Sequence, residues 1–67
     1  MDERERENFI KSIAATIERN NCAIKRDDLY KKYSNTDRDK LKRIIEVMLR
    51  RGTLKYDYNN DKYRLIL

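Results

Sequence analysis

The residues of this chain whose types favour binding chemistry are its lysines and arginines, and they concentrate in the last two thirds of the sequence. Residues 20–67 carry thirteen basic and seven acidic side chains, a sum of +6, whereas residues 2–19 sum to −1. The whole 67-residue chain carries +5 and has a pI near 9.5. A basic surplus of this kind favours a polyanionic partner, although it does not identify one.

The residue types give little support to catalysis or metal binding. The chain has no histidine and a single cysteine, Cys22, so neither a serine or cysteine triad nor a Cys/His zinc site can be built within it. Ser12 and Ser34 are explained by a helix face and a helix cap, and Cys22 is expected to be a small core residue. We therefore expect no enzymatic activity, no metal and no cofactor.

The best-defined element available to position the cations is a helix predicted over residues 37–51. Its apolar side chains follow the i, i+3, i+4, i+7, i+8 spacing of one helix face: Leu41, Ile44, Ile45, Met48 and Leu49. Thr36, with Asp39 three residues later, has the spacing of a capping box. Gly52 follows as a left-handed stop. This pattern predicts a helix with one buried face and one charged outer face.

Two helices and a short strand are predicted before this helix. Residues 9–17 mark one apolar helix face, and residues 1–8, which are polar apart from Met1, form either its solvated first two turns or a frayed end. Residues 22–24 are a short apolar run that predicts a brief strand. Asp27 or Asp28 is expected to cap a second helix of about two turns. The apolar face of that helix holds Leu29, Tyr30 and Tyr33.

A β-hairpin is predicted at the end of the sequence. Residues 53–58 and 62–67 alternate apolar and polar side chains, and Asn59 and Asn60 between them tolerate the positive φ of a type I′ turn. With that turn, the opposed residues are Leu54 with Leu65, Lys55 with Arg64, Tyr56 with Tyr63, and Asp57 with Lys62. A slip of one residue would oppose apolar to charged side chains. One face of the hairpin is therefore expected to cover the core, and the other face is expected to be solvent-exposed and basic.

The predicted elements follow the order helix, short strand, helix, helix and C-terminal hairpin, in a single α+β domain over residues 1–67. The junction between the last helix and the hairpin reads VMLRRGTLKY over residues 47–56, and KYRL at residues 62–65 closes the hairpin. In these features, over residues 9–67, the sequence resembles the winged helix-turn-helix family. The resemblance implies a fold of order helix–strand–helix–helix–strand–strand, with the hairpin as the wing. In DNA-binding members of the family, the third helix lies in the major groove and the wing contacts a flanking backbone or minor groove, whereas other members bind only proteins.

The resemblance and the charge pattern together suggest which residues would contact DNA. The expected base contacts are Thr36, Arg38, Lys40, Arg43 and Val47. The expected backbone contacts are Lys31, Lys32, Arg50, Lys55, Asn59, Asn60, Lys62 and Arg64. Val47 is expected to be exposed, where it suits a thymine methyl group or an apolar partner. Lys55 opposite Arg64 is a like-charge pair, which is easier to explain if the pair faces an anion.

Acidic and aromatic residues keep other interpretations open. Asp37 and Asp39 add negative charge to the outer helix face, although carboxylates in a first helical turn also stabilise the helix. Glu46 is expected to pair within the helix, with Lys42 or Arg50. The five tyrosines suggest base stacking, but four lie on expected core faces. Tyr58 is the one expected at the surface.

The favoured hypothesis is a double-stranded DNA-binding protein, a small transcription regulator. The alternative is a winged-helix protein–protein interaction module of a replication, transcription or cell-division complex, and a third possibility is non-specific coating of nucleic acid. A homodimer through the first helix stays open. The longest apolar stretches are three residues, far short of the ~20 that cross a bilayer, and the start lacks the apolar core of a signal peptide. We therefore expect an intracellular protein, cytoplasmic or nucleoid-associated, with no membrane partner.

Overall fold

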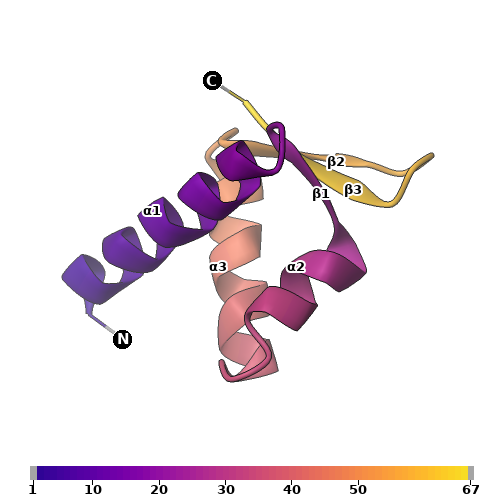
Figure 1. Ribbon diagram of the computed structural model, residues 1–67. Helices are drawn as coiled ribbons and strands as arrows, with labels where there is room; N and C mark the ends of the chain where they lie inside the picture. The colour runs from indigo at the N-terminus through magenta and orange to yellow at the C-terminus, as the bar shows by residue number, and fades with distance from the viewer. Residues whose placement is uncertain (1, 67) are drawn as a thin grey trace.

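A computed structural model describes residues 2–66, which form three helices and one three-stranded antiparallel sheet (Figure 1). The elements are α1 (Glu3–Arg19), β1 (Ala23–Lys25), α2 (Arg26–Lys32), α3 (Arg38–Arg50), β2 (Leu54–Asp57) and β3 (Lys62–Leu65). The α+β class and the element order predicted from the sequence are confirmed. The β2–β3 hairpin projects to one side of the three helices (Figure 1). Within the described residues, no helix is both long and apolar enough to cross a membrane.

Helix α1 begins at Glu3, well before residue 9, where its apolar pattern starts. The side chain of Asp2 accepts a hydrogen bond from the backbone N–H of Glu5 at 2.8 Å, and the helix starts at Glu3. This cap satisfies one of the free N–H groups at the helix start, and the acidic residues of the first turn complement the helix dipole. Of the two alternatives for residues 1–8, the solvated first turns are confirmed for the described residues, and the frayed end is wrong.

The segment that follows α1 differs from the prediction by one residue. Cys22 adopts a left-handed φ of 62°, so the strand begins at Ala23 and not at Cys22. Helix α2 spans seven residues, close to the two turns expected, but its N-cap residue, Lys25, makes no side-chain cap bond. The predicted cap by Asp27 or Asp28 is therefore wrong. Both carboxylates lie within the first turn of α2, where they interact favourably with the positive end of the helix dipole.

Helix α3 is capped one residue later than the capping-box spacing suggests. Asp37 Oδ1 accepts from the backbone N–H of Asp39 at 2.9 Å, and this carboxylate takes the role predicted for Thr36. The helix ends at Arg50, and Gly52, with φ 78°, provides the predicted left-handed stop. Four of the five apolar residues of the predicted stripe are buried: Leu41, Ile44, Ile45 and Met48. Leu49, expected in the core, is only half-buried because it lies at the edge of the stripe.

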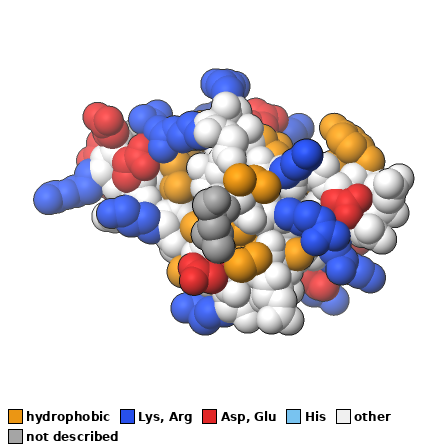
Figure 2. All heavy atoms as spheres, turned by 90° about the horizontal axis from the view of Figure 1, so that it is seen from above, with side chains coloured by type: hydrophobic (Ala, Val, Ile, Leu, Met, Phe, Trp, Pro, Cys, Tyr) orange, Lys and Arg blue, Asp and Glu red, His pale blue; other side chains and the backbone are white. Residues whose placement is uncertain are grey.

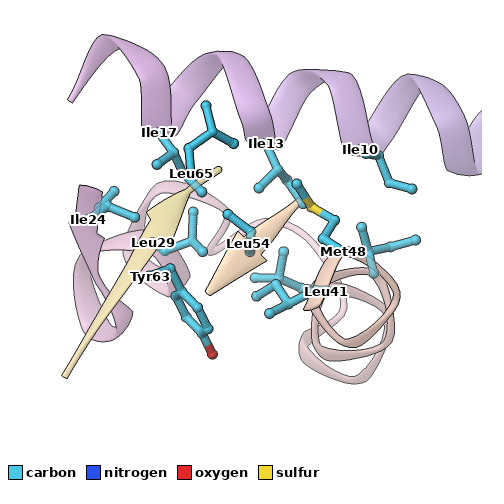
Figure 3. Packing of buried hydrophobic residues seen from close by; sticks show 12 residues of the cluster. Ile10, Ile13, Ile17, Ile24, Leu29, Leu41, Met48, Leu54, Tyr63 and Leu65 are labelled. Carbon is cyan, nitrogen blue, oxygen red and sulfur yellow. The ribbon is translucent and has the colours of Figure 1, made fainter. Parts of the chain in front are cut away.

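The core lies between the three helices and one face of the sheet. Figure 3 shows Ile10, Ile13 and Ile17 extending from α1 toward side chains of α3 and the sheet. The prediction that one face of the hairpin covers the core is confirmed, since Leu54, Tyr63 and Leu65 are 3 %, 7 % and 9 % exposed. The sheet order is β1-β3-β2, so β3 is the central strand and pairs with both neighbours.

The hairpin has the predicted register but a different turn. All four predicted pairs occur: Leu54 with Leu65, Lys55 with Arg64, Tyr56 with Tyr63, and Asp57 with Lys62. The type I′ turn is wrong, because neither Asn59 nor Asn60 has a positive φ. The left-handed residue is Asp61, with φ 52°, at the end of a four-residue loop over 58–61. The register nevertheless holds, because only this pairing places the apolar side chains of both strands on the core face.

Candidate nucleic-acid interface

Three of the five predicted base contacts lie together in a hollow between α1 and α3. Lys40, Arg43 and Val47 line it from α3, and Glu5 and Arg6 line it from the start of α1. Lys40 and Arg43 are exposed, whereas Val47 is half-buried and packs against the core. The expectation of an exposed Val47 is therefore wrong, because α1 extends far enough toward the N-terminus to cover that flank of α3.

The hollow is lined by equal numbers of cations and carboxylates. Its lining contains the cations Arg6, Lys40 and Arg43, the carboxylates Glu5, Asp37 and Asp39, and the apolar side chains Ile44 and Val47. The carboxylate of Asp37 is already used as the cap of α3. Arg6 has a buried Nε with no hydrogen-bond partner among the residues that the structure describes. The hollow can therefore offer donors to an anion, but its carboxylates also suit a partner with mixed charges.

The α1 side of this hollow was missed in the sequence analysis. The sequence predicts either solvated turns or a frayed end for residues 1–8, and neither alternative places Glu5 and Arg6 beside α3. A signal for their placement was present, since Asp2 and Glu5 stand at the spacing of a capping box. That spacing locates the start of the helix, whereas the contact between α1 and α3 depends on tertiary packing.

The other two predicted base contacts lie on a different surface. Thr36 and Arg38 line a second hollow, between α2 and α3, together with Tyr30 and Lys31. Thr36 is half-buried, and its backbone N–H donates to the carbonyl of Tyr33 at 2.9 Å. The guanidinium carbon of Arg38 lies 5.0 Å from the centre of the Tyr30 ring, within the range of a cation–π contact. The five residues therefore do not line one common hollow.

The two lysines of α2 share one hollow with Asn20, Ile24 and Asp28, and each of them also lines a second one. Lys31 lines the hollow that contains Arg38, whereas Lys32 lines a hollow with Thr16, Arg19 and Asn20 at the end of α1. Both lysines belong to the last turn of α2, where cations complement the negative end of the helix dipole. Only Lys31 of this pair therefore shares a hollow with a residue of α3.

The outer face of the hairpin contains a carboxylate between its cations. Arg64 Nη2 donates to Asp57 Oδ2 at 3.2 Å, while Lys55 stays exposed and Lys62 is half-buried. The like-charge pair of Lys55 and Arg64 thus has an internal anion nearby, so it does not by itself require an external one. Of the cations expected to contact the DNA backbone from this hairpin, Lys55 is the one that is exposed without a salt bridge among residues 2–66.

The hairpin tip is held by the same carboxylate. Asp57 Oδ1 accepts from the backbone N–H groups of Asn59 and Asn60 at 3.0 and 3.3 Å, and Asn60 Nδ2 donates to Oδ2 at 2.9 Å. The hydrogen bond from the Asn60 side chain, with further ones from Arg64 and the loop backbone, lowers the pKa of Asp57 from 3.8 to about 2. Asn59 and Asn60 lie at the exposed tip as expected, but part of their donor capacity is used within the loop.

Charged side chains are dispersed over the face of the molecule that Figure 2 shows. In Figure 2, Lys and Arg side chains are spread around the surface with Asp and Glu side chains among them, and they do not merge into one basic patch. Arg50, the remaining predicted backbone contact, is exposed in the last turn of α3.

Comparisons of the chain with protein-family models, with curated proteins and with solved structures gave no match.

Proposed function

We propose that this chain is a winged helix-turn-helix domain that binds double-stranded DNA and regulates transcription. In this proposal, α3 enters the major groove and the β2–β3 hairpin is the wing, which contacts a flanking backbone. The element order, the three-stranded sheet and the basic balance of residues 20–67 support it. Helix α3 is also rigidly placed, because its apolar face is buried against α1 and the sheet.

The observation that carries the proposal is the set of unpaired cations on α3. All five cations of α3 are exposed, and none of them has a salt bridge within residues 2–66: Arg38, Lys40, Lys42, Arg43 and Arg50. The arginines elsewhere that form ion pairs do so with carboxylates of their own chain, as Arg64 does with Asp57. Unpaired arginine is the side chain best suited to guanine in the major groove, because it can donate two hydrogen bonds to O6 and N7.

The roles within this interface follow from the placement of the residues. Arg43 and Lys40 would contact base edges, and the part of Val47 that stays accessible would contact a thymine methyl group. Arg50 and Lys55 would neutralise phosphates, with Lys31 as a third contact beside the start of α3. Thr36 and Arg38 would belong to the edge of the interface, because they line a separate hollow.

The test is a salt series of binding to duplex DNA. A library of labelled duplexes is screened by fluorescence anisotropy at about 50 mM salt, where phosphate contacts are strongest, and the preferred duplex is then compared with a random one at increasing salt. The proposal expects affinity for both duplexes that falls with salt, and tighter binding to the preferred one. Absence of affinity for every duplex at low salt would contradict it.

One observation favours a second function, a protein–protein interaction module. The hollow between α1 and α3 combines the apolar Ile44 and Val47 with equal numbers of cations and carboxylates in its lining. Such a surface is better matched to a protein segment of mixed charge than to a polyanion. If the salt series finds no DNA binding, this hollow becomes the leading candidate site.

A further inference from the structure

We propose that Tyr58 is a stacking site for an unpaired nucleobase, an inference that rests on the proposed DNA binding and names the kind of DNA preferred. Tyr58 lies in the loop at the end of the hairpin and is 87 % exposed. The other exposed large hydrophobic residue among those described is Ile66, beyond the opposite end of β3. Tyr58 is therefore the one largely exposed aromatic ring among the described residues.

The Tyr58 ring is oriented although it is not buried. Its centre lies 4.7 Å from that of Tyr56, with the two rings nearly perpendicular at 85°. The Tyr56 ring in turn lies 5.1 Å from the ring of Tyr63, a core residue. Three aromatic rings thus run from the core to the tip. The edge-to-face contact with Tyr56 restrains the Tyr58 ring and still leaves most of its surface open.

The loop that carries Tyr58 is itself well ordered by hydrogen bonds. Asp57, directly before Tyr58, accepts bonds from the backbones of Asn59 and Asn60 and from the Asn60 side chain. At the other end of the loop, the carbonyl of Asp61 accepts from the backbone N–H of Arg26 at 3.0 Å. A ligand that stacks on Tyr58 would therefore order little additional chain, which lowers the entropic cost of binding.

The charges near the tip tolerate a nucleic-acid backbone. The nearest carboxylate in sequence, Asp57, is compensated by Arg64 and by the loop donors, and its side chain is only 17 % exposed. Asp61 is more exposed, and its carboxylate lies 3.9 Å from the guanidinium of Arg26. Lys55 on β2 adds an exposed cation to the same hairpin. A phosphate beside the stacked base would thus meet cations as well as screened carboxylates.

An unpaired base fits this site better than a paired base or a protein surface. A paired base within a duplex has both faces covered by its neighbours, whereas an unpaired base offers a free face for an aromatic side chain. A stable protein interface typically needs about 800 Å² per partner, whereas here a single exposed ring lies in a polar loop. We infer that the hairpin favours duplex DNA that carries unpaired nucleotides.

The experiment compares two DNAs and three substitutions of one residue. The DNAs are a fully paired duplex and the same duplex with about three extra thymidines bulged from one strand. Affinity of the wild-type protein is measured by anisotropy, alongside Tyr58→Phe, Tyr58→Leu and Tyr58→Ala. Ile66→Ala is the matched control, because it removes the other exposed apolar side chain. Thermal melting followed by circular dichroism verifies that every variant is folded.

The proposal expects the wild-type protein and Tyr58→Phe to bind the bulged duplex about tenfold more tightly than the paired one. Tyr58→Leu and Tyr58→Ala should lose this preference and keep their affinity for the paired duplex, and Ile66→Ala should behave as wild type. If the wild-type protein binds both DNAs equally, the stacking site is wrong while the proposed DNA binding stands, and the ring is left for a protein contact. Failure to bind either DNA would overturn both proposals.

Discussion

Arg51 holds Glu7 through two contacts, Nη2 to Oε1 at 2.8 Å and Nη1 to Oε2 at 3.1 Å. The two residues are 44 positions apart, so this paired interaction ties the early part of α1 to the residue just after α3. The hydrogen bond from Arg51 lowers the pKa of Glu7 below its ordinary value, which shows that the interaction favours the ionised carboxylate. Glu7 lies next in sequence to Arg6, which lines the hollow beside Arg43.

Glu7→Gln is expected to loosen the start of α1 without unfolding the domain. Both partners are partly exposed, so the effect is small, and hydrogen exchange of the amides in the first two turns should become about two- to fivefold faster. Glu18→Gln is the control, because it removes a carboxylate from α1 that has no salt bridge within residues 2–66. Equal exchange in Glu7→Gln and the wild-type protein would show that the cap at Asp2 is sufficient to hold this helix start.

Ile45→Ala is expected to lower the free energy of unfolding by about 2 to 5 kcal/mol. Ile45 is 2 % exposed at the centre of the apolar face of α3, and its truncation removes buried methyl groups and leaves a cavity. This loss is a large share of the stability of so small a domain. Urea denaturation measures it, with Lys42→Ala as the control on the exposed side of the same helix, where a change within about 0.5 kcal/mol is expected.

Two glycine substitutions distinguish the observed loop from the type I′ turn predicted from sequence. Asp61→Gly should stabilise the protein by up to about 1 kcal/mol, because Asp61 has a left-handed φ of 52° that glycine adopts without strain. Asn60→Gly should destabilise it by about 0.5 to 1.5 kcal/mol, because it removes the hydrogen bond from the Asn60 side chain to Asp57. Thermal melts of the two variants give the signs. If Asn60→Gly stabilised the protein and Asp61→Gly destabilised it, the type I′ turn would be supported over the observed loop.

Most of the fold could be predicted from the sequence because its apolar residues are periodic. The period of α3 predicts which face is buried, and the alternation of the hairpin permits only one register, so both predictions are confirmed. The turn type was wrong because Asn-Asn composition is a local signal. The side chain of Asp57 instead stabilises a longer loop that places Asp61 in the left-handed region.

The candidate site was less predictable than the fold, because it depends on contacts between distant segments. The exposed positions of Lys40 and Arg43 follow from helical period, but the cover that α1 provides for Val47 does not. In the same way, the pairing of β1 with β3 joins segments about 40 residues apart and has no signature in either strand alone. The separation of Thr36 from Arg43 is likewise a property of how α2 packs beside α3.

Acid should loosen the hairpin loop before the core is affected. The folded-state pKa of Asp57 is about 2, below its ordinary value of 3.8, so the ionised carboxylate stabilises the fold. This contribution is fully present above about pH 4 and is lost as the pH falls toward 2. NMR chemical shifts of the Asn59 and Asn60 amides, followed through this range, should report the loss. Asp57→Asn should remove the pH dependence, and an unchanged titration in that variant would contradict the assignment.

The proposed interface predicts different effects for Arg43 and Lys55. Arg43→Ala should remove a base contact, at a cost of about 1 to 3 kcal/mol on the preferred duplex and little on a random one, so that specificity relaxes. Lys55→Ala should weaken binding to both duplexes alike and reduce the slope of log K against log salt by about one, because one fewer counterion is released.

Arg19→Ala is the matched control for both variants, since it removes an exposed cation at the end of α1 that lies in neither α3 nor the hairpin. Arg19→Ala should leave the preference for the preferred duplex, and the slope of log K against log salt, near the wild-type values. All three side chains are exposed, so each variant should melt close to the wild-type temperature. If Arg43→Ala weakened both duplexes equally, Arg43 would be a phosphate contact, and α3 would not read bases through it. If Arg19→Ala matched Lys55→Ala, the binding would be a general effect of net charge, and the hairpin would have no special role.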